Sequence, residues 1–130
     1  MSKPAILCVD DEAIVLESLE IQLQKYFGSK YLYEFAESAE EALEIIEEFV
    51  EQQIHVVVII SDWLMPGMKG DEFLVRVHQK IPNVIKIMLT GQADAEAIER
   101  AKDEANLYQL FHKPWDTSQL VQSIGMSLEQ

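Results

Sequence analysis

Acidic side chains follow two apolar runs of this sequence, and their placement indicates metal and phosphoryl chemistry. Asp62 comes shortly after the apolar run 56–60, and Asp10-Asp11-Glu12 comes directly after the apolar run 5–9. If both runs are strands, these carboxylates meet at one edge of a sheet. Carboxylates so close together repel one another unless a hard divalent cation binds between them, and Mg²⁺ prefers oxygen ligands.

A hydroxyl and an ammonium group are expected at the same edge. Thr90 follows the strand-like run 85–89, and Lys113 follows the run 110–112. In open α/β sheets, ligands bind at the carboxyl ends of the strands. An acid cluster, a hydroxyl and a lysine at successive strand ends therefore predict a site that handles phosphoryl groups.

The elements that must position these residues alternate between strand and helix through five units. The predicted strands cover 5–9, 32–36, 55–61, 85–89 and 107–112. The first and third are almost continuously apolar, which is typical of strands buried on both faces. Alternation of this kind predicts a single α/β domain with a parallel sheet covered by helices on both sides.

Five helices are predicted from apolar residues at helical spacing and from start signals. Expected caps are Ser38 with Glu41, Asp71, Asp94, and Asp116 with Gln119. The stripes expected to be buried comprise Leu16, Leu19, Leu23 and Tyr26 or Phe27; Ala42, Ile45, Ile46, Phe49 and Val50; Phe73, Leu74, Val77 and Ile81; Ala97, Ile98, Ala101 and Ala105; and Leu120, Val121, Ile124 and Leu128.

Size and charge restrict the possible functions. The chain has 130 residues, enough for one domain over 1–130, and a formal net charge of −13. This charge argues against binding of a nucleic acid backbone, and it favours metal cations and basic protein surfaces. The apolar runs are too short to cross a bilayer and the first residues lack a signal-peptide pattern, so a cytoplasmic protein without membrane contact is expected. The single cysteine, Cys8, lies in an apolar run and is expected to be a reduced core residue.

Four motifs together resemble the receiver domain of two-component response regulators. They are Val9-Asp10-Asp11-Glu12, the segment from Ser61 to Gly70, Leu89-Thr90-Gly91 and Lys113-Pro114, and they span nearly the whole chain. The resemblance implies a doubly wound (βα)5 flavodoxin-like three-layer sandwich. Its five-stranded parallel sheet would have the order 2-1-3-4-5.

The resemblance also implies a role for each site residue. Asp62 would be the nucleophile that accepts a phosphoryl group, with Lys113 paired to that group and the Thr90 hydroxyl hydrogen-bonded to it. A Mg²⁺ ion would be the cofactor, held directly by Asp11 and Asp62, through water or outer contacts by Asp10, and by the backbone carbonyl of Leu64.

The partners implied are a sensor histidine kinase or a phosphotransfer protein as phosphoryl donor. Phosphorylation would change the face made by the fourth helix, the fifth strand and the fifth helix, and so control a downstream protein or a fused output domain. The chain would not be an enzyme beyond its own phosphorylation and dephosphorylation. Many receivers have a Tyr or Phe three residues before the lysine, where this chain has Leu110.

Other functions remain open at this point. An aspartate-nucleophile phosphohydrolase would need a second aspartate two residues after the nucleophile, where Leu64 stands. A flavodoxin-like FMN-binding module would need a Gly-, Ser- and Thr-rich loop in place of Asp10-Asp11-Glu12, which would repel a phosphate. A phosphorylation-independent interaction module would not require the acid cluster.

Overall fold

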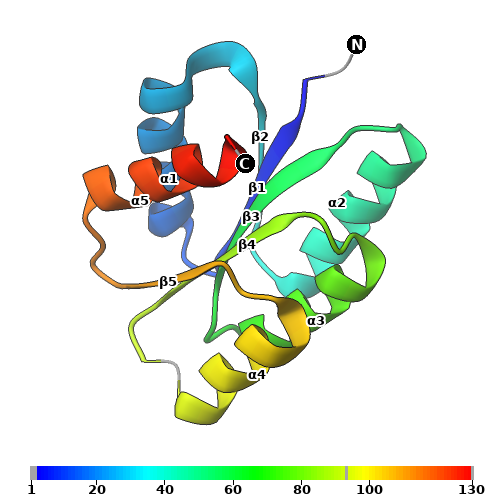
Figure 1. Cartoon of the computed structure of the whole chain (residues 1–130), viewed down its shortest axis with the longest axis vertical. Helices are drawn as coiled ribbons and strands as arrows, with labels where there is room; N and C mark the ends of the chain where they lie inside the picture. The colour runs from blue at the N-terminus through cyan, green and yellow to red at the C-terminus, as the bar shows by residue number, and fades with distance from the viewer. Residues whose placement is uncertain (1–2, 93, 130) are drawn as a thin grey trace.

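The computed structural model describes residues 3–92 and 94–129, and within them a parallel five-stranded sheet has helices on both faces (Figure 1). The strands are β1 (Ala5–Val9), β2 (Leu32–Ala36), β3 (Val56–Asp62), β4 (Ile85–Thr90) and β5 (Gln109–His112). Their order in the sheet is β2-β1-β3-β4-β5, and every neighbouring pair is parallel. The predicted α/β architecture and strand order are confirmed, although β5 begins two residues later than predicted.

Four helices fill the crossover connections between successive strands, and a fifth follows the last strand. They are α1 (Ala13–Phe27), α2 (Ala39–Glu51), α3 (Gly70–Lys80), α4 (Ala95–Ala105) and α5 (Thr117–Leu128), with a short 3-10 turn, η1 (Gly28–Lys30), after α1. Figure 1 shows α1 and α5 side by side on one face of the sheet and α2, α3 and α4 on the other. Within the described ranges, no helix combines the length and the apolar character that a membrane span requires.

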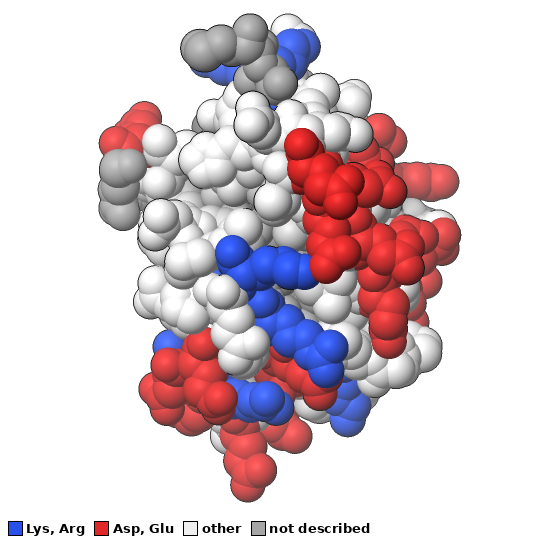
Figure 2. All heavy atoms as spheres, turned by 90° about the vertical axis from the view of Figure 1, so that its right-hand side faces the viewer, with Lys and Arg blue, Asp and Glu red and all other residues white. Residues whose placement is uncertain are grey.

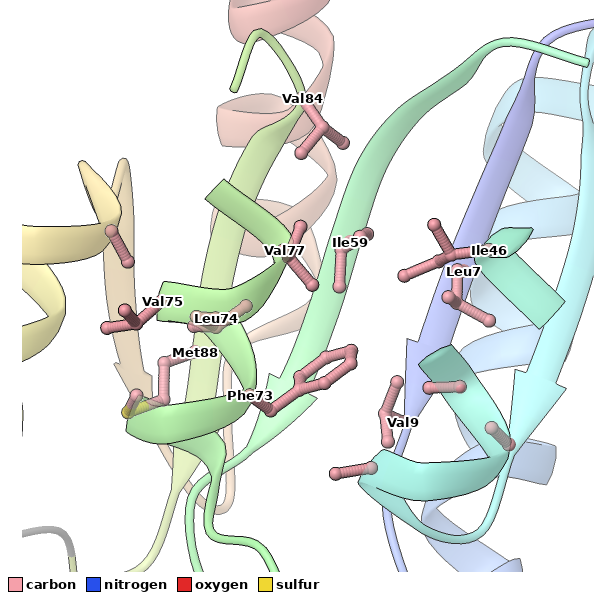
Figure 3. Packing of buried hydrophobic residues seen from close by; sticks show 14 of the residues in the cluster. Leu7, Val9, Ile46, Ile59, Phe73, Leu74, Val75, Val77, Val84 and Met88 are labelled. Atoms are coloured by element: carbon pink, nitrogen blue, oxygen red, sulfur yellow. The ribbon is translucent and has the colours of Figure 1, made fainter. Parts of the chain in front are cut away.

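Two apolar clusters, one on each face of the sheet, make up the core. Alternate strand residues point to opposite faces, so Leu7 and Ile59 pack toward α2 and α3, whereas Ile6 and Ile60 pack toward α1 and α5. Figure 3 shows Phe73 of α3, which is completely buried, pointing from its helix toward the sheet. The central strands β1 and β3 are buried almost throughout, as their continuous apolar runs predict.

Three of the four predicted helix caps are confirmed. The capping side chain accepts a hydrogen bond from the backbone amide three residues later in the pairs Ser38 with Glu41, Asp94 with Ala97 and Asp116 with Gln119. Each cap satisfies an amide that has no partner inside its helix, and this fixes where the helix begins.

The prediction that Asp71 caps the third helix is wrong. Helix α3 begins at Gly70 after the N-cap residue Lys69, so Asp71 lies in its first turn. The Gly70 amide donates to the backbone oxygen of Trp63 at 2.8 Å, which holds the start of the helix against the end of β3. The carboxylate of Asp71 instead accepts a hydrogen bond from the Trp63 indole.

One position of the predicted apolar stripes differs from expectation, and the choice left open in the first helix is decided. Of Tyr26 and Phe27, Phe27 packs against the α1 and α5 side of the core, whereas Tyr26 is 58% exposed. Val50 is 51% exposed because Phe49 takes the buried position in the last turn of α2, and the next residue is turned about 100° around the helix.

Candidate functional site

A pocket of about 530 Å³ lies where the carboxyl ends of the central strands meet the loops that follow them. Its lining includes Asp11 after β1, Asp62 and Leu64 after β3, Thr90 at the end of β4 and Lys113 after β5. The rest of the lining comprises Glu12, Met65, Pro66, Gly91 and Gln92. The side chains that the sequence predicts at one sheet edge are therefore brought together by the fold.

Three carboxylates form the acidic part of this site. Asp10, Asp11 and Asp62 each offer a carboxylate oxygen, and these oxygens all lie within 4.8 Å of one another. Asp10 and Asp62 are buried, whereas Asp11 is exposed to the pocket. A small set of carboxylate oxygens beside open space suits Mg²⁺, which keeps several of its waters. Leu64 lines the same pocket, and the role of its carbonyl as a ligand stays a prediction.

Lys113 supplies the positive charge of the site. Its Nζ lies 2.7 Å from Asp10 Oδ2, 3.4 Å from Asp62 Oδ1 and 3.7 Å from Glu12 Oε1. Burial opposes the charge on Lys113, but the hydrogen bond and charge of Asp10, together with those of Asp62, outweigh it and raise the lysine pKa. Lys113 therefore remains an ammonium group that binds the acid cluster.

The pKa values of the two buried carboxyl groups, Asp10 and Asp62, are raised above their ordinary values. Burial, and then the charge of Asp10, raise the pKa of Asp62 to about 6, although Lys113 and the Trp63 amide act against this shift. Burial also raises the pKa of Asp10, which Lys113 only partly offsets. One lysine therefore does not fully compensate the cluster, and a divalent cation between the carboxylates would favour their ionised forms.

Thr90 links the last two strands at the site. Its backbone oxygen accepts a hydrogen bond from the Lys113 amide at 3.0 Å, and its Oγ1 accepts one from the Gln92 amide at 3.2 Å. The threonine side chain is almost completely buried beside the pocket. Because a hydroxyl that accepts one bond still has its own hydrogen, Thr90 can donate to an oxygen placed in the pocket.

Close backbone contact holds the segment after Asp62 in place. A Cβ at position 70 would lie 2.2 Å from the backbone oxygen of Asp62 and 2.8 Å from the Cα of Trp63, so only glycine fits there. Gly67 has a φ of 82°, a conformation that glycine adopts without strain. These two glycines allow the chain to turn directly from the strand into α3.

The sequence did not predict the contacts of Trp63. Its side chain is 8% exposed and packs in the core, and it also takes part in the polar structure of the site. Its backbone amide donates to Asp62 Oδ1 at 2.9 Å, and its indole Nε1 donates to Asp71 Oδ1 at 3.0 Å. The only signal in the sequence is general, since a buried indole N–H needs an acceptor.

Comparison with protein families identifies the class of this site. The model of the response regulator receiver domain matches residues 6–125. The chain belongs to the response regulator receiver family. The predicted resemblance is thereby confirmed, and the chain is a receiver domain of a two-component system, related to response regulators.

Curated relatives are longer than this receiver domain. The hydrogenase transcriptional regulatory protein HoxA of Cupriavidus necator is 32% identical over 124 residues, which is 95% of this chain and 24% of HoxA. The sensor kinase CckA of Brucella abortus is 30% identical over 125 residues, or 96% of this chain and 12% of the kinase. The chain thus spans about a quarter of HoxA and a smaller part of CckA.

Solved structures of receiver domains have the same fold. The signal receiver domain of an HD domain-containing protein from Pseudomonas fluorescens Pf-5 has a TM-score of 0.86 and 32% identity, covering 98% of this chain and 96% of that one. A CheY-like receiver domain protein from Methanospirillum hungatei JF-1 has a TM-score of 0.85 and 30% identity, with 98% and 95% covered.

Proposed function

We propose that residues 1–130 form one receiver domain in which Asp62 accepts a phosphoryl group within a two-component phosphorelay. The observation that carries this proposal is the placement of three carboxylates within 4.8 Å of one another, beside Thr90 and Lys113, in one open pocket. The donor is a histidine kinase or a phosphotransfer protein in the cytoplasm, where we place this chain.

Magnesium fits the donor set of this pocket. Asp11 and Asp62 would bind the ion directly, the Leu64 carbonyl would add an oxygen, and Asp10 would act through water or as an outer contact. When bound, Mg²⁺ supplies positive charge that offsets the negative charge of the carboxylates and of an incoming phosphoryl group. The raised pKa values of Asp62 and Asp10 agree with a site whose ionised form needs such a cation.

The transfer itself needs a nucleophilic oxygen that faces the pocket and groups that stabilise charge. A carboxylate oxygen of Asp62 attacks the phosphorus atom, the bond from phosphorus to the donor breaks, and the donor histidine leaves as neutral imidazole after taking a proton. Lys113 then exchanges part of its contact with Asp10 for the phosphoryl oxygens. The Thr90 hydroxyl donates to one of these oxygens, which draws the end of β4 toward the site.

The consequence for signalling is a change on the face made by α4, β5 and α5. Thr90 ends β4, and α4 begins five residues later, so a movement of the threonine displaces the start of that helix. A downstream protein or a fused output domain would respond to this face. The chain itself would act as a phosphoacceptor and catalyse only its own phosphorylation and dephosphorylation.

Intact-mass measurement with a small phosphodonor tests the assignment of Asp62. Acetyl phosphate should add one phosphoryl group to the receiver domain, only with Mg²⁺ present, and Asp62→Asn should abolish the adduct. Asp103→Asn, which changes an exposed aspartate of α4, is the matched control and should be modified like the parent. Modification of the parent protein at another aspartate would show that the nucleophile is assigned wrongly.

A further inference from the structure

A second polar network leads away from Asp62, separate from the contacts of Lys113 with the acid cluster. It begins at Trp63, whose amide donates to Asp62 Oδ1 at 2.9 Å and whose indole Nε1 donates to Asp71 Oδ1 at 3.0 Å. Because the Trp63 side chain is 8% exposed, packing holds its ring in place as well as the hydrogen bond does. A shift of the backbone at Asp62 is therefore transmitted to the indole and to its acceptor.

Asp71 connects this network to helix α4. Its second oxygen, Oδ2, lies 3.7 Å from Nη1 of Arg100, which also has Nε 3.5 Å from Oε2 of Glu104. The Asp71 side chain is only 13% exposed, and it contacts the indole through a hydrogen bond and the guanidinium through an ion pair. The carboxylate thus joins the residue after the phosphoacceptor to a helix that is distant in sequence.

Helix α4 has little apolar surface with which to resist movement. The buried residues of its inner face are Ala97, Ala101 and Ala105, which bury much less apolar area than the Phe, Leu and Val side chains on the inner face of α3. Figure 2 shows the Lys and Arg side chains of one face as a band between two acidic areas. Among the described residues of α4, Arg100 is the one basic side chain that takes part in an ion pair. The position of α4 should therefore respond to this contact.

We propose that Trp63 and Asp71 are positioning residues that couple the state of Asp62 to helix α4 through Arg100. This inference rests on the proposed phosphorylation of Asp62 and adds a second route to the one that runs through Thr90. Phosphorylation converts the Asp62 carboxylate, which accepts a hydrogen bond from the Trp63 amide, into an acyl phosphate, and so changes the charge next to that amide. The indole then moves with residue 63, Asp71 follows its donor, and Arg100 carries the change to α4.

The chain offers variants that separate this route from ordinary effects on folding. Trp63→Phe removes the indole N–H and keeps an aromatic ring, and Arg100→Gln removes the ion pair at a side chain that is 42% exposed. Lys102→Gln is the matched control, because it makes the same charge change at an exposed position of the same helix.

Backbone amide chemical shifts provide the measurement. Beryllofluoride with Mg²⁺, a stable mimic of the phosphoryl group, is added to saturation, and the shift changes over 95–105 are compared within each variant. We expect Trp63→Phe and Arg100→Gln to reduce these changes at least about twofold, while Lys102→Gln matches the parent. The double variant Trp63→Phe/Arg100→Gln should reduce the shift changes no further than the more severe of the two single variants, because both substitutions interrupt one network. Thr90→Ala combined with Arg100→Gln should lose more than either alone.

Two results would overturn the proposal in distinguishable ways. If the parent responds in α4 and Arg100→Gln responds equally, the network does not carry the coupling, and the function proposed for Asp62 stands. If the mimic causes no shift at Asp62 in the parent, the phosphoacceptor assignment and the inference built on it both fall. Persistent shifts at Asp62 and Thr90 in the variants would show that they still fold and bind the mimic.

Discussion

Replacement of Asp62 by asparagine should stabilise the folded protein when no divalent cation is present. The Asp62 side chain is 6% exposed, and burial followed by the charge of Asp10 raises its pKa from 3.8 to about 6. A pKa raised by folding means that the folded state binds the proton more tightly than the unfolded state does. Ionisation of this carboxylate at neutral pH therefore lowers the free energy of unfolding, and asparagine, which resembles the protonated acid, avoids that loss.

The size of the effect follows from the shift. About two pKa units correspond to about 3 kcal/mol as an upper limit. We expect about 1–2 kcal/mol, because Lys113 and solvent near the pocket reduce the cost of the charge. The difference between variant and parent should be absent below pH 3.8, where Asp62 is protonated in both states, and should grow as the pH rises through about 6.

Urea unfolding in the presence of a chelator measures this difference. The parent and Asp62→Asn are compared at about pH 7.5, where we expect the asparagine variant to have the higher midpoint, and at about pH 4, where the midpoints should nearly coincide. Asp103→Asn, at an exposed position of α4, should match the parent at both values. An Asp62→Asn variant that is equal to or less stable than the parent at the higher pH would refute the reasoning, because Lys113 would then compensate the buried charge completely.

Three further changes test other parts of the structure. Asp11→Asn should shift the Mg²⁺ titration, followed by Trp63 fluorescence, to higher concentration, and an unchanged titration would remove Asp11 from the metal site. Gly70→Ala should lower the free energy of unfolding by about 1–3 kcal/mol, because the added Cβ would lie 2.2 Å from the backbone oxygen of Asp62. Urea unfolding measures this difference, and a variant as stable as the parent would contradict the close approach. Burial lowers the pKa of Lys86 from 10.5 to about 8, so this lysine should contribute stability that increases as the pH rises from about 8 to 10.5. Lys86→Met should remove that contribution, measured as the difference in stability between parent and variant in denaturation at several pH values.

The central part of the fold could be predicted because burial restricts its sequence. The apolar runs of β1 and β3 fit no exposed element, and each ends in aspartate where the strand meets the pocket. The start of β5 was less predictable, because the Leu107 amide bonds back to Ala101 of α4, whereas the Tyr108 amide donates to the backbone oxygen of Lys86 in β4 just before the strand begins. Residues 107–108 thus have a strand-like sequence but lie in the connection from the helix.

The site was predictable as a set of residues and not as a set of contacts. Strand-end positions are enough to bring Asp62, Thr90 and Lys113 to one edge. The pairing of Lys113 with Asp10, and of Trp63 with Asp71, depends on how far each side chain reaches once the strands and helices are packed. The start predicted for α3, with Asp71 as its cap, was wrong for the same reason, since the close approach of Gly70 to β3 decides where that helix begins.

The contact between Lys113 and Asp10 has a consequence for the order in which the protein is built. The two residues are 103 positions apart, and the lysine follows the last strand of the sheet. While the chain emerges from the ribosome, β1, β3 and their aspartates are present well before their positive partner. If β1 and β3 pair before β5 is made, their carboxylates lie near one another without the lysine, and a divalent cation would relieve their repulsion during this stage. Addition of the fifth strand ends that stage, so the receiver domain can react only after its own last strand and Lys113 have been made.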